Sequence, residues 1–273
     1  MAHDPDSAHA EAEDSHKDRV REERVRDERG VGARLGGAVR ETVVVLAMAL
    51  TLSFVVKTFL IQAFFIPSES MQNTLLVGDR VVVSKLTPGP FELKRGDIVV
   101  FADPGDWLSP TPVTNRGAVL NGLRDAMMFV GLLPDTSEGH LIKRVIGMPG
   151  DHVQCCDAEG RLLVNGEPIE ESAYLKPGVN PSDMEFDITV PSGRMWVMGD
   201  NRSDSSDSRY HDPGGTGSDG SVPLDLVVGK AVVTVWPFDR AGRLSTHEDV
   251  FSQVPDAGSN RSLGLPVREP HSS

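Results

Sequence analysis

The longest apolar run in the chain extends from Thr42 to Ile61 and follows a polar, densely charged stretch. Its first part, TVVVLAMALTLSFVV, carries no charge, and Lys57 lies near the end of the run. At about 1.5 Å of rise per helical residue, the run would measure about 30 Å, the thickness of a bilayer's hydrocarbon core. We therefore expect a transmembrane helix over residues 42–63.

The flanks of this run distinguish a membrane anchor from a cleaved signal peptide. Residues 1–41 are too long for the polar start of a signal peptide, and no clear small-x-small cleavage site follows the run. Arg29, Arg34 and Arg40 precede it, whereas no basic residue occurs just after it. The positive-inside rule then predicts a single-pass protein of the cell membrane, with a cytoplasmic N-terminus and an extracytoplasmic domain.

Beyond residue 80 the pattern changes to short runs that are rich in β-branched residues and bounded by turn residues. Such runs, without long helices between them, predict a mainly β domain built from antiparallel sheets. The expected strands are Val81–Lys85, Asp97–Phe101, Leu141–Ile146, Arg161–Val164, Met195–Met198 and Lys230–Trp236.

The same patterns divide the rest of the chain. The charged tail, residues 1–41, cannot bury enough apolar surface to offset chain entropy, so we expect it to be disordered. The extracytoplasmic domain should cover residues 64–240, followed by a polar, loosely ordered tail over 241–273. Within the domain, residues 103–139 form an insertion in which Arg116–Leu133 has helical spacing. That helix would pack on the β core or lie on a membrane surface; both interpretations remain open.

Composition and charge exclude several classes of function. The net charge of −13, from 27 basic and 40 acidic residues, disfavours binding to nucleic acid. None of the eight histidines has metal-ligand spacing, so we expect solvated or structural roles for them. No metal or cofactor is implied. The two cysteines, Cys155 and Cys156, are adjacent, and neighbouring strand side chains point to opposite faces. We therefore expect two unpaired thiols. The oligomeric state stays open.

Three segments carry candidate chemistry, although each is unspecific when taken alone. Ser70 lies in IPSESMQNTL, shortly after the apolar run, but loops contain many serines. Lys143 lies in the expected strand LIKRVI, where burial of its ammonium would lower its pKa and let the amine act as a general base. Most strand lysines instead reach solvent. The third segment, GDNRSDSSDSR, has the composition of a tight surface turn.

Taken together and in this order after an apolar anchor, the segments resemble bacterial type I signal peptidases. The resemblance covers the anchor and most of residues 64–237. It implies a serine endopeptidase with a Ser/Lys dyad that removes signal peptides from exported preproteins with small residues at positions −1 and −3. It also implies two antiparallel sheet systems, the smaller at about 152–196. The matching segments are GDRVVVSK (78–85), RGDIVVF (95–101), KRVIGMPGD (143–151) and GDNRSDSSDSR (199–209).

The resemblance implies a role for each matching site residue. Ser70 corresponds to the nucleophile, and Lys143 to the general base that takes its proton. Ser68 corresponds to the serine whose hydroxyl helps form the oxyanion hole with the Ser70 backbone N–H. Ser205 corresponds to the serine that hydrogen-bonds the lysine and orients it.

Other positions of the last motif correspond to structural residues or depart from the family pattern. Asp207 and Arg209 resemble a pair that holds the loop under the site. The family's Ser-Met-x-Pro-Thr-Leu becomes Ser-Met-Gln-Asn-Thr-Leu, with Asn73 in place of proline; because asparagine is also a turn residue, we expect little effect. Ser203 and Asp204 stand where Asp-Asn is usual, so the resemblance assigns them no role.

Rival functions fail on particular features of the sequence. Self-cleaving repressors and mutagenesis proteins, which by resemblance share this fold and also use Ser/Lys, are soluble, so the apolar run over residues 42–61 argues against both. A repressor also carries a DNA-binding domain, for which the charged tail has no helix-turn-helix pattern. Penicillin-recognising enzymes need Ser-x-x-Lys and Lys-Thr-Gly, and α/β-hydrolases need Gly-x-Ser-x-Gly; all three motifs are absent. A non-catalytic, membrane-anchored binding module or a degenerate paralogue need not retain a matched nucleophile and base, so the presence of both Ser70 and Lys143 argues against these alternatives.

Overall fold

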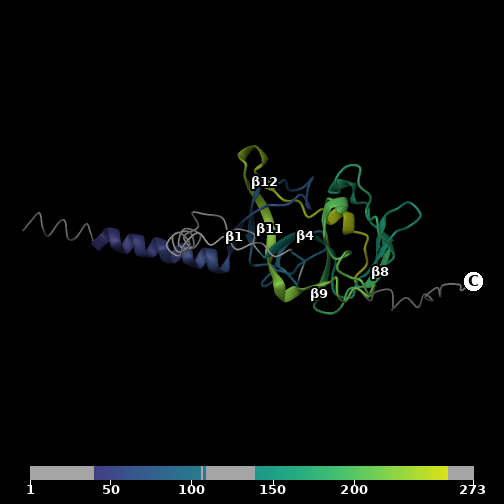
Figure 1. Cartoon of the computed structure of the whole chain (residues 1–273). Coiled ribbons are helices and arrows are strands. Elements are labelled where there is room, and N and C mark those ends of the chain that lie inside the picture. The colour runs from purple at the N-terminus through teal and green to yellow at the C-terminus, as the bar shows by residue number, and fades with distance from the viewer. Residues whose placement is uncertain (1–39, 106, 109–138, 258–273) are drawn as a thin grey trace, which may run out of the picture. The chain divides into compact units, whose positions relative to one another are not determined.

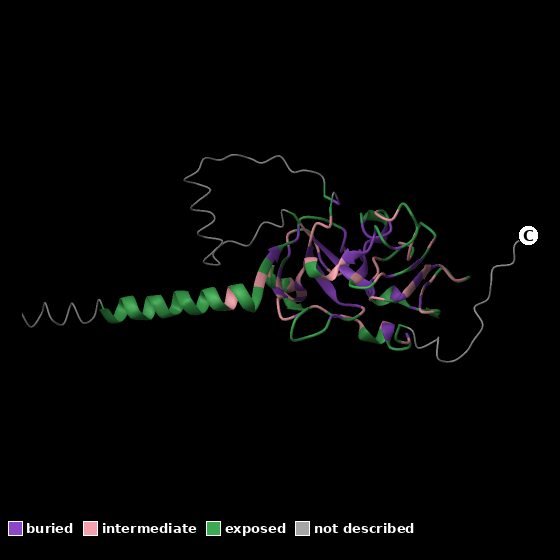
Figure 2. Ribbon diagram, turned by 90° about the horizontal axis from the view of Figure 1, so that it is seen from below, coloured by how far each residue is buried: buried purple, intermediate pink, exposed green. Residues whose placement is uncertain are grey.

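A computed structural model describes residues 40–105, 107, 108 and 139–257 of the chain. Its contacts divide the chain into two units, Met1–Phe54 and Val55–Ser273. The described part of the first unit is helical and belongs to a 20-residue helix, Arg40–Phe59 (Figure 1). This helix is exposed along almost its whole length (Figure 2), and its length and apolar composition suffice to cross a membrane.

The helix ends earlier than its apolar composition predicts. The expectation of a helix up to residue 63 is wrong at its end, because Ile61–Phe65 forms strand β1. This strand pairs antiparallel with β2, Arg80–Ser84. Pairing satisfies the backbone groups of β1 that face β2 and lets Phe64 enter the core with 2% of its surface exposed. Hydropathy alone does not reveal this change, because the residues of β1 are as apolar as those of the helix.

An eight-stranded antiparallel sheet forms the larger part of the domain (Figure 1). Its strand order is β1-β2-β11-β3-β4-β9-β10, and β12 pairs with β11. The expected mainly β fold is confirmed, and each of the six expected strands is present with its ends shifted by up to three residues. The further strands of this sheet are β3 Ile98–Ala102, β4 His140–Gly147, β9 Arg194–Met198, β10 Val222–Pro223, β11 Val227–Trp236 and β12 Gly242–Arg243.

A second, four-stranded antiparallel sheet lies between β4 and β9 in the chain, with the strand order β7-β6-β5-β8. This is the smaller sheet system that the resemblance implies, although its expected end at about residue 196 is too late. Strand β9 already belongs to the larger sheet. The four strands are β5 His152–Cys155, β6 Leu162–Val164, β7 Glu167–Pro168 and β8 Phe186–Thr189.

Five short 3₁₀ helices occur in the described connections. They are η1 Glu171–Ala173, η2 Arg202–Asp204, η3 Leu224–Leu226, η4 Phe238–Arg240 and η5 Glu248–Phe251. The first of them lies between β7 and β8, and the second follows β9 directly. Both lie next to the candidate site described below.

Strand β4 contributes to all three clusters of buried apolar side chains. Ile142 packs with side chains of β1, β2 and β3, and Val145 packs with those of β3, β9 and β10. Ile146 packs with the smaller sheet. Because β4 is also paired on both sides, by β3 and β9, its backbone has little freedom to move. The residues between these anchors, Lys143 and Arg144, inherit that rigidity.

The segment after residue 240 is more structured than its polar composition predicts. Strand β12 pairs with β11, and Phe251 and Val254 are buried against the core of the smaller sheet. The backbone of Thr246 passes so close to Gly96 that a Cβ there would lie 2.1 Å from the Thr246 carbonyl oxygen. The expectation of loose order is therefore wrong up to residue 257, because two apolar side chains dock this segment.

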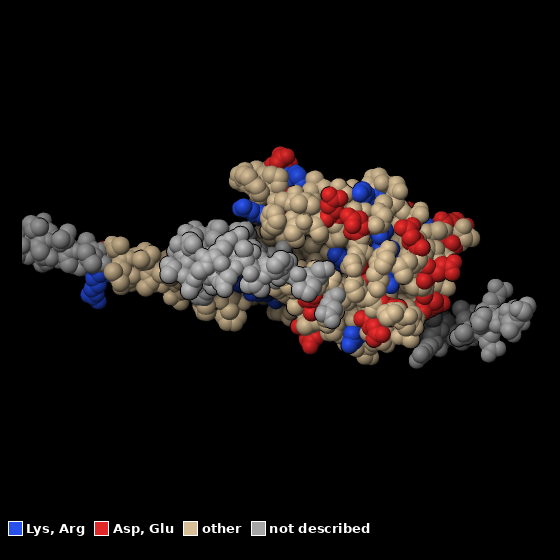
Figure 3. All heavy atoms as spheres, in the orientation of Figure 1, with Lys and Arg blue, Asp and Glu red and all other residues tan. Residues whose placement is uncertain are grey.

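Two expectations lie outside the described residues. They are the disorder of the charged tail before residue 40 and the helix at Arg116–Leu133; the last part of the expected polar tail, residues 258–273, lies outside as well. Figure 3 shows more acidic than basic side chains on the face in view, in keeping with the negative net charge.

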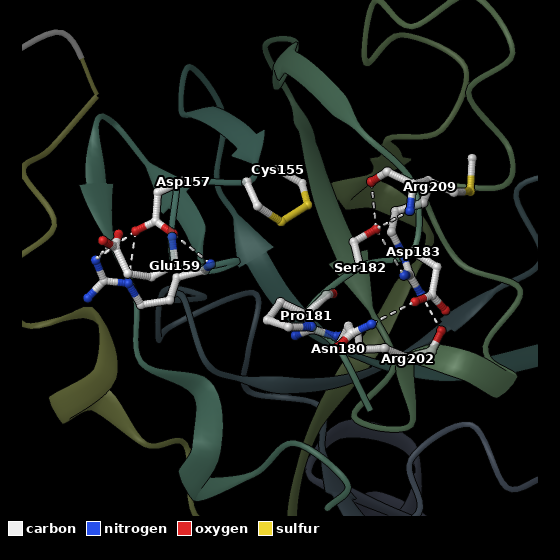
Figure 4. Close-up of a disulfide and its surroundings, with 12 residues drawn as sticks. Cys155, Asp157, Glu159, Asn180, Pro181, Ser182, Asp183, Arg202 and Arg209 are labelled. Atoms are coloured by element: carbon white, nitrogen blue, oxygen red, sulfur yellow. Dashed lines mark hydrogen bonds and ion pairs between the residues drawn. A yellow bond between two sulfur atoms is a disulfide. The ribbon is translucent and has the colours of Figure 1, made fainter. Parts of the chain in front are cut away.

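The structure also corrects the expectation for the cysteines. Cys155 and Cys156 are joined by a disulfide between neighbouring residues (Figure 4). Cys155 is the last residue of β5 and pairs with Leu162 and Phe186. Cys156 lies beyond the end of the strand, so the strand alternation used to separate the two thiols does not extend to it.

Candidate active site

The loop that carries Ser70 follows β1 directly and is fastened at several points. Met71 and Leu75 are fully buried, and the Leu75 N–H donates to the Met71 carbonyl over 2.8 Å. Asn201, from the loop after β9, donates its backbone N–H to the Ser70 carbonyl over 3.0 Å and its side chain to the Glu69 carbonyl over 3.1 Å. Ser70 itself is 6% exposed.

Lys143 lies in the middle of β4 and reaches this serine. Its Nζ lies 2.7 Å from Ser70 Oγ and 3.1 Å from the carbonyl oxygen of Ile142. The side chain is 4% exposed, although most strand lysines extend to solvent. The structure therefore brings together the two residues, 73 positions apart, that the resemblance pairs.

The surroundings of Lys143 favour a neutral amine. Burial lowers the pKa of Lys143 from 10.5 to about 8, although the carboxylates of Asp207, Asp200 and Asp204 act in the opposite direction. Desolvation dominates because a charged ammonium loses its hydration in this site. A pKa near 8 leaves a useful fraction of uncharged amine at neutral pH, as a general base requires.

Ser68 and Ser205 differ in how the structure places them. Ser68 is exposed, and its Oγ lies 3.4 Å from Ser70 Oγ. Ser205 is 5% exposed, but its Oγ makes no hydrogen bond to any described residue, so the expected bond to Lys143 is not formed. Ser205 still borders the site, because a Cβ on Gly199 would lie 2.3 Å from Ser205 Oγ and 2.4 Å from the Ser70 carbonyl oxygen. Both roles stay predictions.

Asp207 and Arg209 form a buried ion pair beneath the loop after β9. Arg209 donates from Nε and Nη2 to the two carboxylate oxygens of Asp207, over 2.9 Å each, and both side chains are fully buried. Asp207 also accepts from the Gly199 N–H, and Arg209 also donates to the Arg202 carbonyl. The pair therefore ties the two ends of the loop together, the geometry expected for its structural role.

These groups suit acyl transfer to a serine hydroxyl. The amine of Lys143 can take the Ser70 proton directly, as the general base does for an activated serine nucleophile. Within residues 40–105, 107, 108 and 139–257, no three His, Cys, Asp or Glu side chains are grouped to hold a metal ion.

Comparison with known proteins identifies the family. Residues 39–236 match the family model described as signal peptidase, peptidase S26. The chain belongs to this family. The matched range contains the Arg40–Phe59 helix and every site residue named above. Membership confirms the resemblance found in the sequence and makes the chain a hydrolase of the signal peptidase class.

Curated relatives agree along most of their length. The probable signal peptidase I of Mycobacterium leprae (strain TN) is 39% identical over 230 residues, 75% of this chain and 78% of that protein. Signal peptidase I of Mycobacterium tuberculosis (strain ATCC 25618 / H37Rv) is 39% identical over 222 residues, with 75% and 74% covered. Signal peptidase I of Leptolyngbya laminosa is 35% identical over 205 residues, with 75% and 83% covered.

Sequence reasoning missed a second buried ion pair in this member of the signal peptidase family. Arg144 donates to the two carboxylate oxygens of Asp200 over 2.8 and 2.7 Å, and neither side chain is exposed. Asp200 also accepts from the Thr74 hydroxyl, so the pair joins β4, the loop after β9 and the Ser70 loop. Strand alternation places Arg144 on the face opposite Lys143, but alternation does not identify a partner so distant in sequence.

A third buried pair connects the smaller sheet to the site. Arg202 Nη1 donates to Glu171 Oε2 over 2.9 Å, and the Tyr174 hydroxyl donates to Glu171 Oε1 over 2.6 Å. Burial raises the pKa of Tyr174 well above its ordinary value, so its hydroxyl stays protonated and continues to donate. The guanidinium of Arg144 lies 4.2 Å from the centre of the Tyr174 ring. The only sequence signal for this network is arginine in the Gly-Asp-Asn-Arg motif.

Proposed function

We propose that the chain is a membrane-bound serine endopeptidase that cleaves N-terminal signal peptides from exported preproteins with a Ser70/Lys143 dyad. Membership of the signal peptidase family and the activities named for its relatives support the reaction. The observation that carries the dyad is the 2.7 Å distance between Lys143 Nζ and Ser70 Oγ, both buried.

In the acylation step, the neutral amine of Lys143 takes the proton of Ser70 Oγ as that oxygen attacks the scissile carbonyl carbon. The Ser68 hydroxyl and the Ser70 backbone N–H would stabilise the developing oxyanion; removal of one such donor typically costs about 10²–10³ in rate. The Lys143 ammonium then gives its proton to the leaving amine, and the peptide C–N bond breaks. An acyl ester on Ser70 and a free mature N-terminus result.

Deacylation uses the same groups with water as the nucleophile. Lys143, again neutral, takes a proton from water, whose oxygen attacks the ester carbon. The C–O bond to Ser70 breaks, and the lysine returns the proton to Ser70 Oγ. The carboxylate of the signal peptide leaves, and the site is restored without any net gain or loss of protons by the enzyme.

The substrate would bind in an extended conformation beside the Ser70 loop. Strand β1 leads directly to Ser70 and is an end strand of its sheet, with β2 as its partner among the described strands. An edge strand can add an extended peptide through main-chain hydrogen bonds, with specificity from pockets for alternate side chains. Small residues at positions −1 and −3 would fill shallow apolar pockets, as the family resemblance implies.

The Arg40–Phe59 helix would anchor the enzyme in the cell membrane. Its length and composition support one crossing, and the arginines before it favour a cytoplasmic N-terminus with the catalytic domain outside. Exported preproteins present their cleavage sites at that surface.

The proposal is tested by cleavage of a preprotein by the full chain in detergent or lipid, with a chelator present. The variants are Ser70→Ala and Lys143→Ala, matched by Ser218→Ala and Lys94→Ala, which change exposed residues of the same types. We expect both dyad variants to lose cleavage while folding is retained, and both controls to cleave like the wild type. Near-normal activity of Lys143→Ala would show that another base serves Ser70, and an inert wild type would refute the function.

A further inference from the structure

The chain between β7 and β8 contacts both loops that carry the candidate site. Asn73, in the Ser70 loop, donates its side-chain amide to the carbonyl oxygens of Tyr174 and Leu175, over 3.1 Å each. On the other side, the N–H of Lys176 donates to the carbonyl oxygen of Asp200 over 3.0 Å. Three consecutive residues of the smaller sheet's connection therefore join the Ser70 loop to the loop after β9.

This connection is itself firmly held. The N–H groups of Tyr174 and Leu175 donate to the Glu171 carbonyl over 3.1 and 2.9 Å, and Tyr174 is 1% exposed. The Glu171 carboxylate is fixed by Arg202 (Figure 4 shows where Arg202 lies). The two carbonyl groups that Asn73 reaches thus belong to a turn that is held by its own hydrogen bonds and by the buried Tyr174.

The Ser70 loop needs such a support more than the lysine does. Lys143 is part of a strand with neighbours on both sides, whereas Ser70 lies in a turn outside the sheet. Asn73 lies three residues after the nucleophile, and the next residue, Thr74, bonds Asp200. A displacement of about 1 Å between reacting groups can cost about 10²-fold in rate, so the position of this turn matters for the reaction.

The backbone of Asn73 also has a conformation that selects the residue type. Its φ of 99° lies in the left-handed region, which glycine adopts freely and asparagine tolerates better than most residues. Proline, which fixes φ near −65°, cannot adopt it and carries no side-chain amide. Asparagine thus supplies both the conformation of the turn and the two hydrogen bonds that fasten it.

We propose that Asn73 is a positioning residue, which fastens the turn after Ser70 to the Tyr174–Leu175 backbone and so keeps Ser70 Oγ within reach of Lys143 Nζ. This inference rests on the proposed Ser/Lys function. Asn73 itself does not touch the reacting atoms; it acts through the position of Ser70.

The test compares Asn73→Gly with Asn73→Pro and a matched control, Asn165→Gly, in the preprotein cleavage assay. Glycine keeps the positive φ and removes only the amide. Asn165 likewise has a positive φ, 54°, and its amide donates to Asp151 and to the Pro255 carbonyl, away from the site. Asn165→Gly therefore reproduces the loss of two hydrogen bonds donated by an amide and the added chain entropy of glycine, and it also removes the bond that Asn165 Oδ1 accepts from the His152 N–H.

We expect Asn73→Gly to lower kcat about tenfold with KM within about twofold of the wild type, because a mispositioned nucleophile impairs the chemical step. Asn73→Pro should lower kcat further. Asn165→Gly should keep the wild-type kcat, even if its melting temperature falls as much as that of Asn73→Gly.

Three results would overturn the inference. One is a wild-type kcat for Asn73→Gly in an enzyme that still depends on Ser70 and Lys143, which would leave the proposed function intact. Another is an equal fall of kcat in Asn165→Gly, which would attribute the effect to general loosening. The third is an inert wild type, which refutes the proposed function and, with it, any positioning role.

Discussion

Lys143 combines two properties that oppose each other in its environment. Burial removes the hydration of its ammonium and lowers its pKa to about 8, which supplies a base at neutral pH. The same burial makes the protonated form costly in the folded state. In the proposed mechanism the residue would therefore affect both the rate and the stability of the protein, with a different pH dependence for each.

The rate should follow deprotonation of Lys143. Because only the neutral amine can take the Ser70 proton, log(kcat/KM) should rise with a slope of about one below pH 8 and level off above it. The measurement is a pH profile with a peptide substrate that does not titrate in this range. A profile that is flat from pH 6 to pH 9 would contradict a base with the lowered pKa of Lys143.

The stability should depend on pH through the same group, with a sign that follows from linkage. Between about pH 8 and 10.5 the unfolded chain keeps the lysine proton while the folded chain has lost it, so this group's contribution to stability rises with pH. Below pH 8, where the folded protein must bury the charged lysine, this group lowers the free energy of unfolding by about 3 kcal/mol.

Lys143→Met, which removes the titrating group but keeps a long apolar side chain, should therefore be inactive and more stable at pH 7. The gain should be up to about 3 kcal/mol and should disappear above about pH 10.5. Chemical denaturation at pH 7 and pH 10.5 measures both values. A variant that is less stable than the wild type at pH 7 would show that the protonated lysine is not a burden to the fold.

At the scale of the elements, buried ion pairs hold the loop after β9 together and connect it to its neighbours. Asp207–Arg209 closes the loop on itself, Arg144–Asp200 ties it to β4, and Arg202–Glu171 ties it to the connection between β7 and β8. A buried pair is costly to form from hydrated ions, but the loss of one partner leaves an uncompensated buried charge. Each partner is thus required once the other is present.

Arg209→Ala should consequently lower the free energy of unfolding by about 3–5 kcal/mol, because Asp207 would be left unpaired in the interior. Arg243→Ala, at an exposed arginine of β12, serves as the control and should change it by less than about 0.5 kcal/mol. Urea denaturation of the two variants checks the difference. Similar values for both would mean that the interior pair is exposed to water in solution.

The strands were easier to predict than their neighbours in the sheet. Val81, Ile98 and Val145 lie in β-branched runs whose local composition is sufficient evidence. Strand β1 was missed because its apolar residues continue the helix without interruption, and the pairing with β2 that selects a strand is a tertiary effect. Cys156 was misjudged for a related reason, since the end of β5 was not visible in the sequence.

Site residues divide in the same way between motif and contact. Ser70 and Lys143 were found because each lies in a family motif, and the structure then placed them together. Glu171 lies in no such motif, and its importance arises from Arg202, 31 residues away in the chain. Asn73 was noticed as a departure from the family pattern, but its two acceptors are backbone groups about a hundred positions away, which no local pattern reveals.

At the scale of the whole molecule, the apolar helix and the catalytic domain have separate proposed roles, one in attachment and the other in cleavage. The helix has almost no buried side chains among its described residues, which agrees with the proposed role as a membrane anchor. The domain buries its own core and carries every proposed site residue. Substitutions in the helix should therefore change the membrane attachment of the protein more than its rate of peptide cleavage.

Leu50→Arg, near the middle of the helix, should weaken membrane insertion by about 3 kcal/mol while cleavage of a short soluble peptide in detergent is retained. Leu50→Ile is the control. Fractionation of membranes after alkaline extraction measures the first effect, and peptide turnover measures the second. Full retention of Leu50→Arg in the membrane would indicate that another part of the chain provides the attachment.

The tight approach of three chain segments at Gly199 limits how this protein can change over time. The space that a single methyl group would need there is already filled by Ser205 Oγ and the Ser70 carbonyl oxygen, at 2.3 and 2.4 Å from the missing Cβ. The restriction is steric and does not depend on the polarity or charge of the new side chain, because alanine and aspartate both carry the Cβ that does not fit. Any substitution of Gly199 would therefore displace the site, whereas Gly242 has open space around it and can accept other residues.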